Sequence, residues 1–315
     1  MIKEPLFFEP VFKERIWGGD RLKTFGYQIP SNQTGECWAF AAHPNGQSIV
    51  RDGHFKGVAL GQLWKYHRGL FGHIEGDRFP LLTKILDANQ DLSVQVHPDD
   101  DYANKHKAGE LGKTECWYII DFEEGAEIIY GHNALSTYEF EKMIQDGKWN
   151  DLLRRVPIKP GDFFFIPSET IHAIGKGTLI LETQQNSDTT YRVYDYDRRD
   201  QDGQLRDLHV EASIAVAAIP SVVQETKPVI KIKDDLKITR FIQSDYFTVS
   251  KWNLDGEVTM NQSLPFKLLS VIAGEGFLVS DETSYSFKKG DHILLPFEFG
   301  EYKLTGKAEL IISHL

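Results

Sequence analysis

The sequence predicts a mainly β fold made of two related modules, and three observations support this prediction. Short β-branched or aromatic runs separated by Gly, Pro, Asn and Asp recur along the chain, which is typical of an antiparallel sandwich or barrel. The turn KPGD at 159–162 leads to Ile-Pro at 166–167, and KKGD at 288–291 leads to Leu-Pro at 295–296 at the same offset. The chain of 315 residues also exceeds a typical domain of about 100–200 residues. It therefore has room for one large domain or two smaller ones.

The predicted strands are interrupted by short helices. Strands are expected at DLSVQVHP, ECWYIID, AEIIYG, DFFFIP and TLILET before residue 185, and at FTVSKWNL, FKLLSVIAG, GFLVS, HILLP and AELIIS after residue 246. The spacing of apolar residues predicts three helical insertions, at about 58–72, 136–156 and 209–219. Ser136 and Glu139 form a capping box at the start of the second insertion.

A domain boundary is predicted at residue 220. The third helix ends at Pro220, and the charged, proline-interrupted segment SVVQETKPVIKIKDD follows it. This boundary divides the chain into modules 1–220 and 221–315. Eleven residues after its turn glycine the first module has His172, whereas the second has Glu301, so the second copy lacks the corresponding histidine.

Composition and charge exclude several classes of protein. Hydrophobic residues make up 41% and charged residues 26% of the chain, close to globular averages, so we exclude disordered and fibrous proteins. Lys and Arg number 35 against 46 Asp and Glu, which gives a net charge of −11. This charge repels nucleic acid and anionic membranes, so we expect neither as a partner. An anionic substrate must therefore meet a locally cationic pocket.

The cysteines and the amino terminus predict a soluble cytoplasmic protein. Cys37 and Cys116 form neither a disulfide framework nor a CxxC metal motif, which fits a reducing compartment. Acids and prolines interrupt the first residues, where a signal peptide needs an apolar run. No stretch reaches the roughly 18 apolar residues of a membrane helix.

Three segments carry candidate metal ligands. In the alternating run LSVQVH, Gln95 and His97 point to the same face, although a half-exposed strand gives the same pattern. Glu115 lies among strand-forming aromatics, where a carboxylate needs a metal or a cation such as Lys113 on the same face. His172 follows a tight turn among isoleucines, where a histidine is either a ligand or a hydrogen-bonded core residue.

Taken together, these residues predict a metal site. Neutral imidazole and carboxylate suit Zn²⁺, Fe²⁺ or Mn²⁺, and the amide oxygen of Gln95 is a weak fourth ligand. Such a site leaves positions open for substrate or water. This is typical of catalysis rather than of a structural zinc site saturated by cysteine.

Arg192 is a candidate anion-binding residue. It lies between Tyr191 and Tyr194, whose rings can orient its guanidinium toward phosphate or enediolate oxygens. The alternative is a surface arginine paired with Asp195 or Asp197. The charged run DYDRRDQDGQLRD is predicted to be a solvated loop without a functional role.

Six sequence blocks resemble a known family. They are IWGG at 16–19, GECWAFAAHPNGQS at 35–48, KILDANQDLSVQVHPDD at 84–100, GKTECWYII at 112–120, GDFFFIPSETIHAIG at 161–175 and ETQQNSDTTYRVYDYDR at 182–198. Over nearly its whole length the chain resembles the type I mannose-6-phosphate isomerases of the short bacterial form, zinc enzymes of the cupin superfamily. The resemblance implies Gln95, His97, Glu115 and His172 as ligands of one Zn²⁺ per chain, and Arg192 as the catalytic arginine.

The same resemblance implies a fold of two cupin-like (jelly-roll) β-barrel modules with small helical insertions. The catalytic, metal-binding module is residues 1–220, and the metal-free module is residues 221–315. His172 follows Glu115 by only 172 − 115 = 57 positions, so the helical domain that longer eukaryotic members carry there is absent. Gln95-x-His97 stands where ordinary cupins have His-x-His, which argues against an iron oxygenase.

The reaction implied by the resemblance interconverts mannose 6-phosphate and fructose 6-phosphate by metal-assisted proton transfer through an enediol. Lys113 is the preferred general base because it shares a strand face with Glu115, and Lys84 or a water at the metal is the alternative. Ser93 and Lys84 are candidate substrate contacts, and Ser93, Lys113 and Arg192 are available for phosphate. The expected partner is thus a small sugar phosphate. A metal-dependent cupin dioxygenase and a non-catalytic sugar-phosphate-binding cupin are the alternatives.

Overall fold

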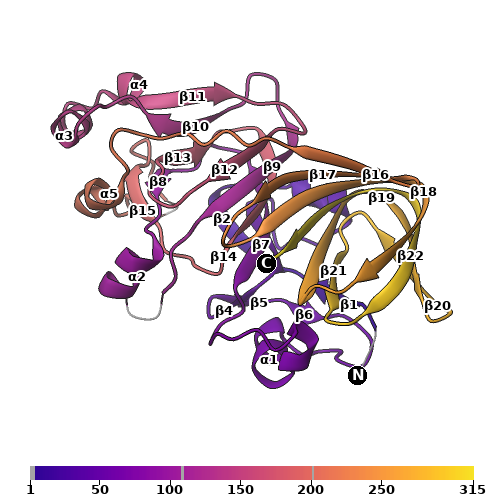
Figure 1. Ribbon diagram of the computed structural model, residues 1–315. Helices are drawn as coiled ribbons and strands as arrows, with labels where there is room; N and C mark the ends of the chain where they lie inside the picture. The colour runs from indigo at the N-terminus through magenta and orange to yellow at the C-terminus, as the bar shows by residue number, and fades with distance from the viewer. Residues whose placement is uncertain (1–3, 108–109, 201) are drawn as a thin grey trace.

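The computed structural model describes residues 4–107, 110–200 and 202–315. Strands account for 48% of the described residues and helices for 14%, which confirms the prediction of a mainly β fold. Figure 1 shows stacked sheets with short helices at their periphery, α2 to α5 at the left and α1 at the bottom. Across the described strands, pairing gives open sheets and no closed barrel. Within the described ranges, no helix is both long and apolar enough to cross a membrane.

Two sheets in the first two thirds of the chain carry the polar segments singled out above. The six-stranded sheet has the order β12 (Phe163–Ile166), β9 (Glu115–Phe122), β14 (Thr178–Gln185), β7 (Leu81–Ala88), β2 (Val11–Gly19) and β3 (Thr34–Phe40). The five-stranded sheet has the order β11 (Leu153–Pro157), β10 (Glu127–His132), β13 (His172–Ile174), β8 (Val94–Val96) and β15 (Tyr191–Tyr194). β4 (Ala42–His43) and β5 (Gly46–Gln47) form a separate pair.

The third large sheet contains the carboxyl-terminal strands and two strands from the amino-terminal part. Its order is β16 (Val229–Lys233), β17 (Leu236–Gln243), β18 (Thr248–Gln262), β22 (Gly300–His314), β19 (Phe266–Ser280), β21 (His292–Pro296), β1 (Leu6–Glu9) and β6 (Ile49–Val50), with β20 (Thr283–Lys288) on β19. Leu6 pairs with Leu294. Backbone hydrogen bonds therefore link the two sides of residue 220, and the boundary there stays a prediction.

Apolar side chains hold the three sheets together in layers. The five- and six-stranded sheets enclose a core that includes Trp117 from β9 and Ile128 and Ile174 from β10 and β13. Another core lies on the opposite face of the six-stranded sheet, against β1, β17, β19 and β21. Strand β14 is consequently buried along its whole length, because both of its faces are covered.

The helices agree only in part with the expected insertions. They are the 3₁₀ turns η1 (Arg21–Phe25) and η2 (Arg68–Phe71), and α1 (Leu60–Tyr66), α2 (Asp100–His106), α3 (Thr137–Gln145), α4 (Trp149–Leu152) and α5 (Val210–Val216). The Ser136 side chain accepts a hydrogen bond from the Glu139 amide at the start of α3. Residues 153–156, placed in a helix by the sequence analysis, belong to strand β11, because Val156 pairs with Ile128 on β10 and Pro157 cannot continue a helix. Helix α2 was not predicted.

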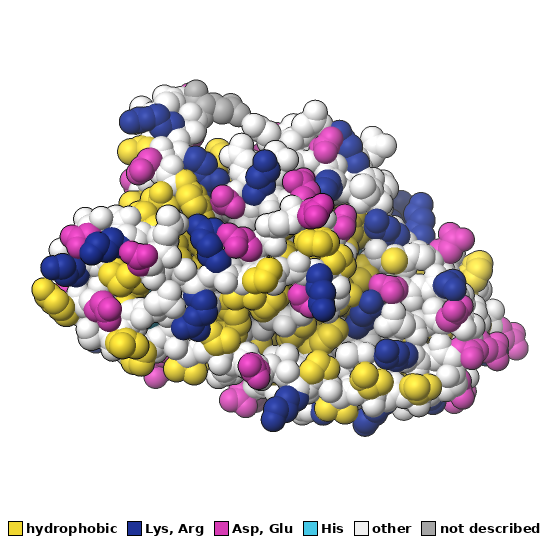
Figure 2. All heavy atoms as spheres, turned by 90° about the horizontal axis from the view of Figure 1, so that it is seen from above, with side chains coloured by type: hydrophobic (Ala, Val, Ile, Leu, Met, Phe, Trp, Pro, Cys, Tyr) yellow, Lys and Arg dark blue, Asp and Glu magenta, His cyan; other side chains and the backbone are white. Residues whose placement is uncertain are grey.

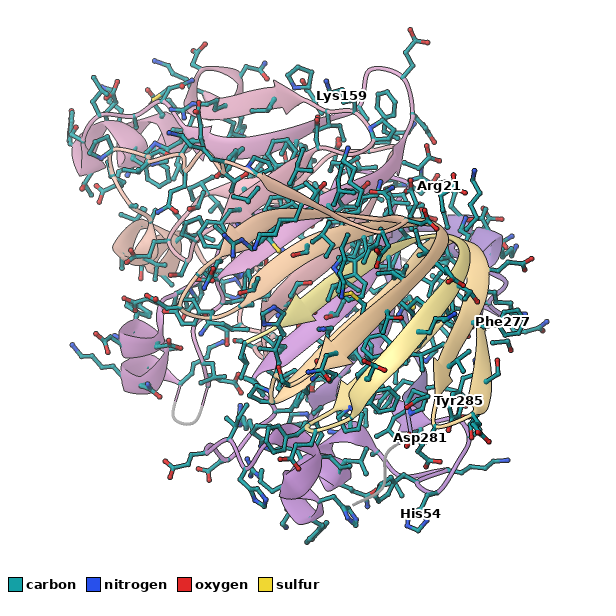
Figure 3. All side chains as sticks on the ribbon, turned by 45° about the vertical axis from the view of Figure 1, so that its right-hand side comes forward. Arg21, His54, Lys159, Phe277, Asp281 and Tyr285 are labelled. Carbon is teal, nitrogen blue, oxygen red and sulfur yellow. The ribbon has the colours of Figure 1, made fainter. Side chains whose placement is uncertain are left out.

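The two repeated turns have the same local structure. Gly161 and Gly290 have φ values of 91° and 94°. In each turn the Asp side chain accepts a hydrogen bond from the backbone of the Lys three residues earlier, at 3.0 Å for Asp162 and 2.8 Å for Asp291. Figure 3 shows Lys159, the first residue of the earlier turn, away from the hairpin that carries Phe277, Asp281 and Tyr285. The sequence repeat thus corresponds to a structural repeat of turn followed by strand.

Alanine substitutions at these two glycines are expected to differ in cost. Both need a positive φ, which costs an L-residue about 1–2 kcal/mol. A Cβ on Gly161 meets nothing within 4 Å, whereas a Cβ on Gly290 would lie 2.3 Å from the Phe25 carbonyl oxygen. Gly290→Ala should therefore lower the midpoint of thermal unfolding clearly more than Gly161→Ala. Equal midpoints for the two variants would contradict the close approach of the second turn to residue 25.

Candidate active site

Three segments bring two histidines and a glutamate together between the five- and six-stranded sheets. His97 directly follows β8, His172 begins β13 next to it, and Glu115 begins β9 in the opposite sheet. One ligand atom from each lies within 4.8 Å of the others. The three side chains are at most 1% exposed, and no other such group of three is found among the described residues. The structure therefore juxtaposes all three predicted histidine and carboxylate ligands.

Backbone carbonyls orient both imidazoles. Nδ1 of His97 lies 2.8 Å from the Thr189 carbonyl oxygen, and Nδ1 of His172 lies 2.8 Å from that of Thr170. A carbonyl only accepts, so each Nδ1 carries the proton and each Nε2 presents a lone pair. Both Nε2 atoms lie near Glu115, at 3.5 Å and 3.4 Å from its oxygens. This is the orientation that metal-binding histidines adopt.

Burial and charge set the protonation states of these groups. Burial, reinforced by Lys113, lowers the pKa of His97 to about 3, and burial also lowers the pKa of His172. Burial alone would raise the pKa of Glu115, but Lys113 and the histidines outweigh it and hold the pKa well below its usual range. Two neutral imidazoles and one carboxylate are thus available at neutral pH. This donor set fits a divalent metal ion.

Gln95 and Lys113 lie against the same atoms. Nε2 of Gln95 is 3.3 Å from Nε2 of His172, with which it pairs across β8 and β13. The Lys113 ammonium is 3.1 Å from Nε2 of His97 and contacts a Glu115 oxygen. The ion pair of Lys113 with Glu115, one of the alternatives left open by the sequence, is therefore present within the same cluster.

A pocket of about 420 Å³ opens beside this cluster. Its lining includes all four remaining predicted residues, Ser93, Lys84, Lys113 and Arg192, together with Gln95. Among its lining side chains six are cationic and three acidic, although the whole chain carries a charge of −11. Figure 2 shows charges of both signs interspersed over one outer face, whereas cations outnumber acids in the lining of the pocket. The pocket suits an anionic ligand.

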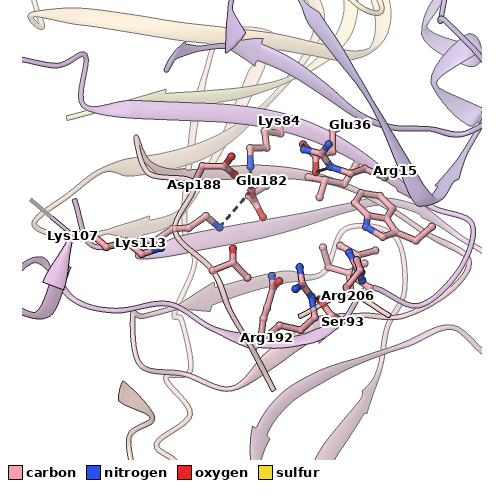
Figure 4. Close-up of a pocket in the computed structure, with 16 residues that line it drawn as sticks. Arg15, Glu36, Lys84, Ser93, Lys107, Lys113, Glu182, Asp188, Arg192 and Arg206 are labelled. Atoms are coloured by element: carbon pink, nitrogen blue, oxygen red, sulfur yellow. Dashed lines mark hydrogen bonds and ion pairs between the residues drawn. The ribbon is translucent and has the colours of Figure 1, made fainter. Parts of the chain in front are cut away.

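Buried charges alternate along one wall of the pocket. Glu182 on β14 lies 3.5 Å from the Lys84 ammonium and 4.0 Å from that of Lys113 (Figure 4). The Trp117 indole donates to both Glu115 and Glu182. Burial alone would lower the pKa of Lys84, but the charges of Glu182 and Glu36 outweigh the effect of burial, so the pKa is raised. Glu182 was not among the predicted site residues, and its only signal in the sequence was a carboxylate at the end of an apolar strand.

Arg192 also lies in the pocket, but its surroundings differ from those expected. Its Nε donates to Ser93 Oγ at 3.3 Å and its Nη1 to the Asp207 carbonyl at 2.7 Å. The prediction that tyrosines orient it is wrong. Alternation turns Tyr191 away from Arg192, and a register shift between Arg192 and Tyr194 places Tyr194 in the same apolar cluster as Tyr191, where it stacks on Trp149. Asp195 pairs instead with arginines of the following loop.

The prediction that the charged run DYDRRDQDGQLRD is a solvated loop without a functional role is wrong, because part of it is buried and part lines the pocket. Asp195 is 4% exposed and binds both Arg198 and Arg206. Arg206 lines the pocket beside Arg192 and Ser93 (Figure 4). The charged composition of the loop hid this contribution, because only the folded chain shows which of its arginines face inward.

Comparisons with known proteins agree with this site. The family model for the catalytic domain of type I phosphomannose isomerase matches residues 6–120, and the model for the cupin domain of mannose-6-phosphate isomerase matches residues 237–315. The chain is 63% identical to the mannose-6-phosphate isomerase ManA of Bacillus subtilis over the full length of both. It is 53% identical to the mannose-6-phosphate isomerase of Streptococcus mutans, over 99% of this chain and 98% of the relative.

Solved structures give the same result. The crystal structure of the mannose 6-phosphate isomerase from Bacillus subtilis superposes with a TM-score of 0.97 at 52% identity, covering 99% of both chains. A putative mannosephosphate isomerase from Archaeoglobus fulgidus shares the fold, with a TM-score of 0.77 at 20% identity over 98% of this chain and 97% of that one. On these similarities, the chain belongs to the type I phosphomannose isomerase family.

Proposed function

We propose that the protein interconverts mannose 6-phosphate and fructose 6-phosphate through an enediol. The observation that carries this proposal is the buried group of His97, Glu115 and His172 beside a cationic pocket. The pocket offers a place for a phosphorylated sugar, and the buried group offers a place for its reacting carbonyl end. The names of the relatives identical at 53–63% support the same activity.

We further propose that His97, Glu115, His172 and Gln95 bind one Zn²⁺. Two neutral imidazoles whose Nε2 atoms face a buried carboxylate support this choice, because zinc prefers nitrogen and carboxylate donors. When bound, the ion supplies Lewis acidity at the substrate carbonyl oxygen. The amide of Gln95, 3.3 Å from His172, is suited to a weaker fourth contact.

The remaining predicted residues have roles in moving protons and holding the sugar. Isomerisation transfers one proton from C2 to C1 and another from O2 to O1. Lys113 is the proposed proton carrier at carbon, because it lines the pocket beside Glu115. Arg192 stabilises the negative charge that develops on the enediol oxygens. Lys84 and Ser93 contact the bound sugar phosphate from opposite walls.

Exchange of substrate hydrogen with solvent tests the proposed chemistry. Incubation with mannose 6-phosphate in D₂O should place deuterium at C2 of recovered mannose 6-phosphate and at C1 of fructose 6-phosphate. A chelator should abolish both incorporation and turnover, and added Zn²⁺ should restore them. Binding of the sugar phosphate without exchange or turnover would indicate a non-catalytic cupin, and oxygen consumption would indicate a dioxygenase.

We also propose two cupin-like modules, at 1–220 and 221–315, for the organisation of the chain. The repeated turn and the cupin-domain match at 237–315 support this division. The first module then carries the proposed catalytic site. Cys37 and Cys116 are free and buried, which supports a cytoplasmic location.

A further inference from the structure

The sequence does not identify which residues bind the phosphate of the substrate, and the pocket offers several cations. Lys84 and Lys113 both lie next to the buried carboxylate of Glu182. The Arg15 guanidinium is bound by both oxygens of Glu36, at 2.8 Å and 3.2 Å. Glu36 itself lines the pocket, so a phosphate at Arg15 would meet a carboxylate on the same surface. These three cations are therefore poorly placed for a dianion.

Arg206 is held differently. Its Nε donates to Oδ2 of Asp195 at 2.7 Å, and its Nη2 donates to Oδ1 of the same carboxylate. Asp195 is 4% exposed and does not line the pocket, so it fixes the guanidinium from behind. In the part of the chain that the structure describes, Nη1 of Arg206 has no hydrogen-bond partner. A rigid guanidinium with a free edge toward a pocket is well suited to phosphate oxygens.

The neighbours of Arg206 complete an anion site. Arg192 lies beside it on the same wall, and Arg206 contributes, after burial, to lowering the pKa of Arg192. Nη2 of Arg192 has no partner among the described residues, and no described carboxylate pairs with Arg192. Ser93, which accepts from Arg192, keeps its hydroxyl proton available for a ligand. Two adjacent guanidinium groups without a carboxylate between them favour a doubly charged anion.

The position of this group fits the length of the substrate. Ser93 lies two residues before Gln95, immediately before β8 begins, which in an extended chain is a separation of about 7 Å. Gln95 touches the proposed metal ligands, and Arg192 pairs with Gln95 across β8 and β15. Ser93, with Arg206 beside it, lies further along the pocket from the reacting end. In a hexose 6-phosphate, the chain from C3 to C6 separates the reacting carbons from the phosphate. The same separation is expected between their binding sites.

We infer that Arg206, with Ser93, binds the phosphate group of the substrate and thereby selects phosphorylated over unphosphorylated sugars. This inference rests on the proposed function for the identity of the ligand. Arg206 is then a substrate-binding residue, and Asp195 is the positioning residue whose carboxylate fixes the orientation of the Arg206 guanidinium.

Arg198 provides a matched control. It shares Asp195 with Arg206, and the two side chains are similarly buried, with 17% and 23% exposed. Arg198 does not line the pocket, because its other guanidinium nitrogen donates to the Asp91 carbonyl. Arg198→Gln and Arg206→Gln therefore remove the same charge and the same partner of Asp195, and only the second removes a group that faces the pocket.

The test measures calorimetric binding of inorganic phosphate to metal-loaded protein, together with KM for mannose 6-phosphate. Arg206→Gln should weaken phosphate binding and raise KM by about ten- to hundredfold, the effect of one lost charge-assisted hydrogen bond. Arg198→Gln should change phosphate affinity and KM by less than about twofold. The effects of Arg206→Lys should lie between those of Arg198→Gln and Arg206→Gln. Unfolding midpoints measured alongside show whether each variant is folded.

Equal losses in Arg198→Gln and Arg206→Gln would overturn the inference, because they would trace the effect to Asp195. Unchanged phosphate binding in Arg206→Gln or Arg206→Lys would overturn it as well. The proposed function fails separately: a wild-type protein that binds phosphate through Arg206 without isomerising the sugar would refute the activity and leave the phosphate site intact.

Discussion

Replacing His172 by alanine is expected to abolish metal retention and turnover together. The substitution removes a buried Nε2 that the Thr170 carbonyl directs toward Glu115, and leaves that carboxylate with fewer partners. Changes to outer contacts of a metal site typically cost about 10–100-fold in affinity, and loss of a ligand should exceed that. His97→Ala should likewise lose both metal and turnover. Zinc content after gel filtration, measured by mass spectrometry, and isomerase activity are the two readouts.

His132 is the matched control for this experiment. It is buried to the same extent as His172, at 1% exposed, and lies on the adjacent strand β10. Its Nε2 lies 3.1 Å from the Ala218 carbonyl oxygen, outside the metal group. His132→Ala should therefore lower stability while keeping the metal. A His172→Ala protein that is folded, active and metal-free would refute the proposed centre.

Replacing Arg192 by alanine is expected to reduce kcat by about 10²–10³-fold, as the loss of one donor to a developing oxyanion does in other enzymes. The side chain is anchored by Ser93 and the Asp207 carbonyl, and the metal group does not depend on it. Metal content should therefore stay at the wild-type level. Steady-state kinetics and metal analysis on the same preparation check both statements.

Arg192→Lys separates charge from geometry. A lysine keeps the positive charge but cannot contact Ser93 and Asp207 while presenting a planar donor edge. We expect it to recover only a small part of kcat. Wild-type kcat in Arg192→Ala would remove this arginine from the mechanism, and a parallel loss of metal would assign it a structural role.

The sequence was informative wherever short-range alternation determines the outcome. Period-two patterns put Gln95 and His97 on one face, and the structure brings His97, Glu115 and His172 within reach of one ion. Resemblance to a family supplied the partners that spacing alone could not. The repeated KPGD and KKGD turns likewise predicted equivalent local structures.

The errors and omissions share a physical cause, which is dependence on contacts distant in sequence. The inward position of Arg206 depends on a buried Asp195 shared with Arg198. The role of Glu182 depends on Lys84 and Lys113 arriving from other strands. Composition marked these segments as charged, but it could not show which charges would be buried together.

The pairing of β1 with β21 has a consequence for how the chain acquires its structure. Leu6 lies opposite Leu294, so β1, which is synthesised first, cannot pair with β21 until a residue 294 − 6 = 288 positions later has been added. Contacts of such high sequence separation slow folding, because the intervening chain must be closed into a loop first. Strand β6 pairs with one edge of β1, but a nascent protein released before β21 emerges would expose the other edge, open to aggregation with other chains. Protection by a ribosome-associated chaperone should therefore matter more for this enzyme than for proteins whose first strands pair locally.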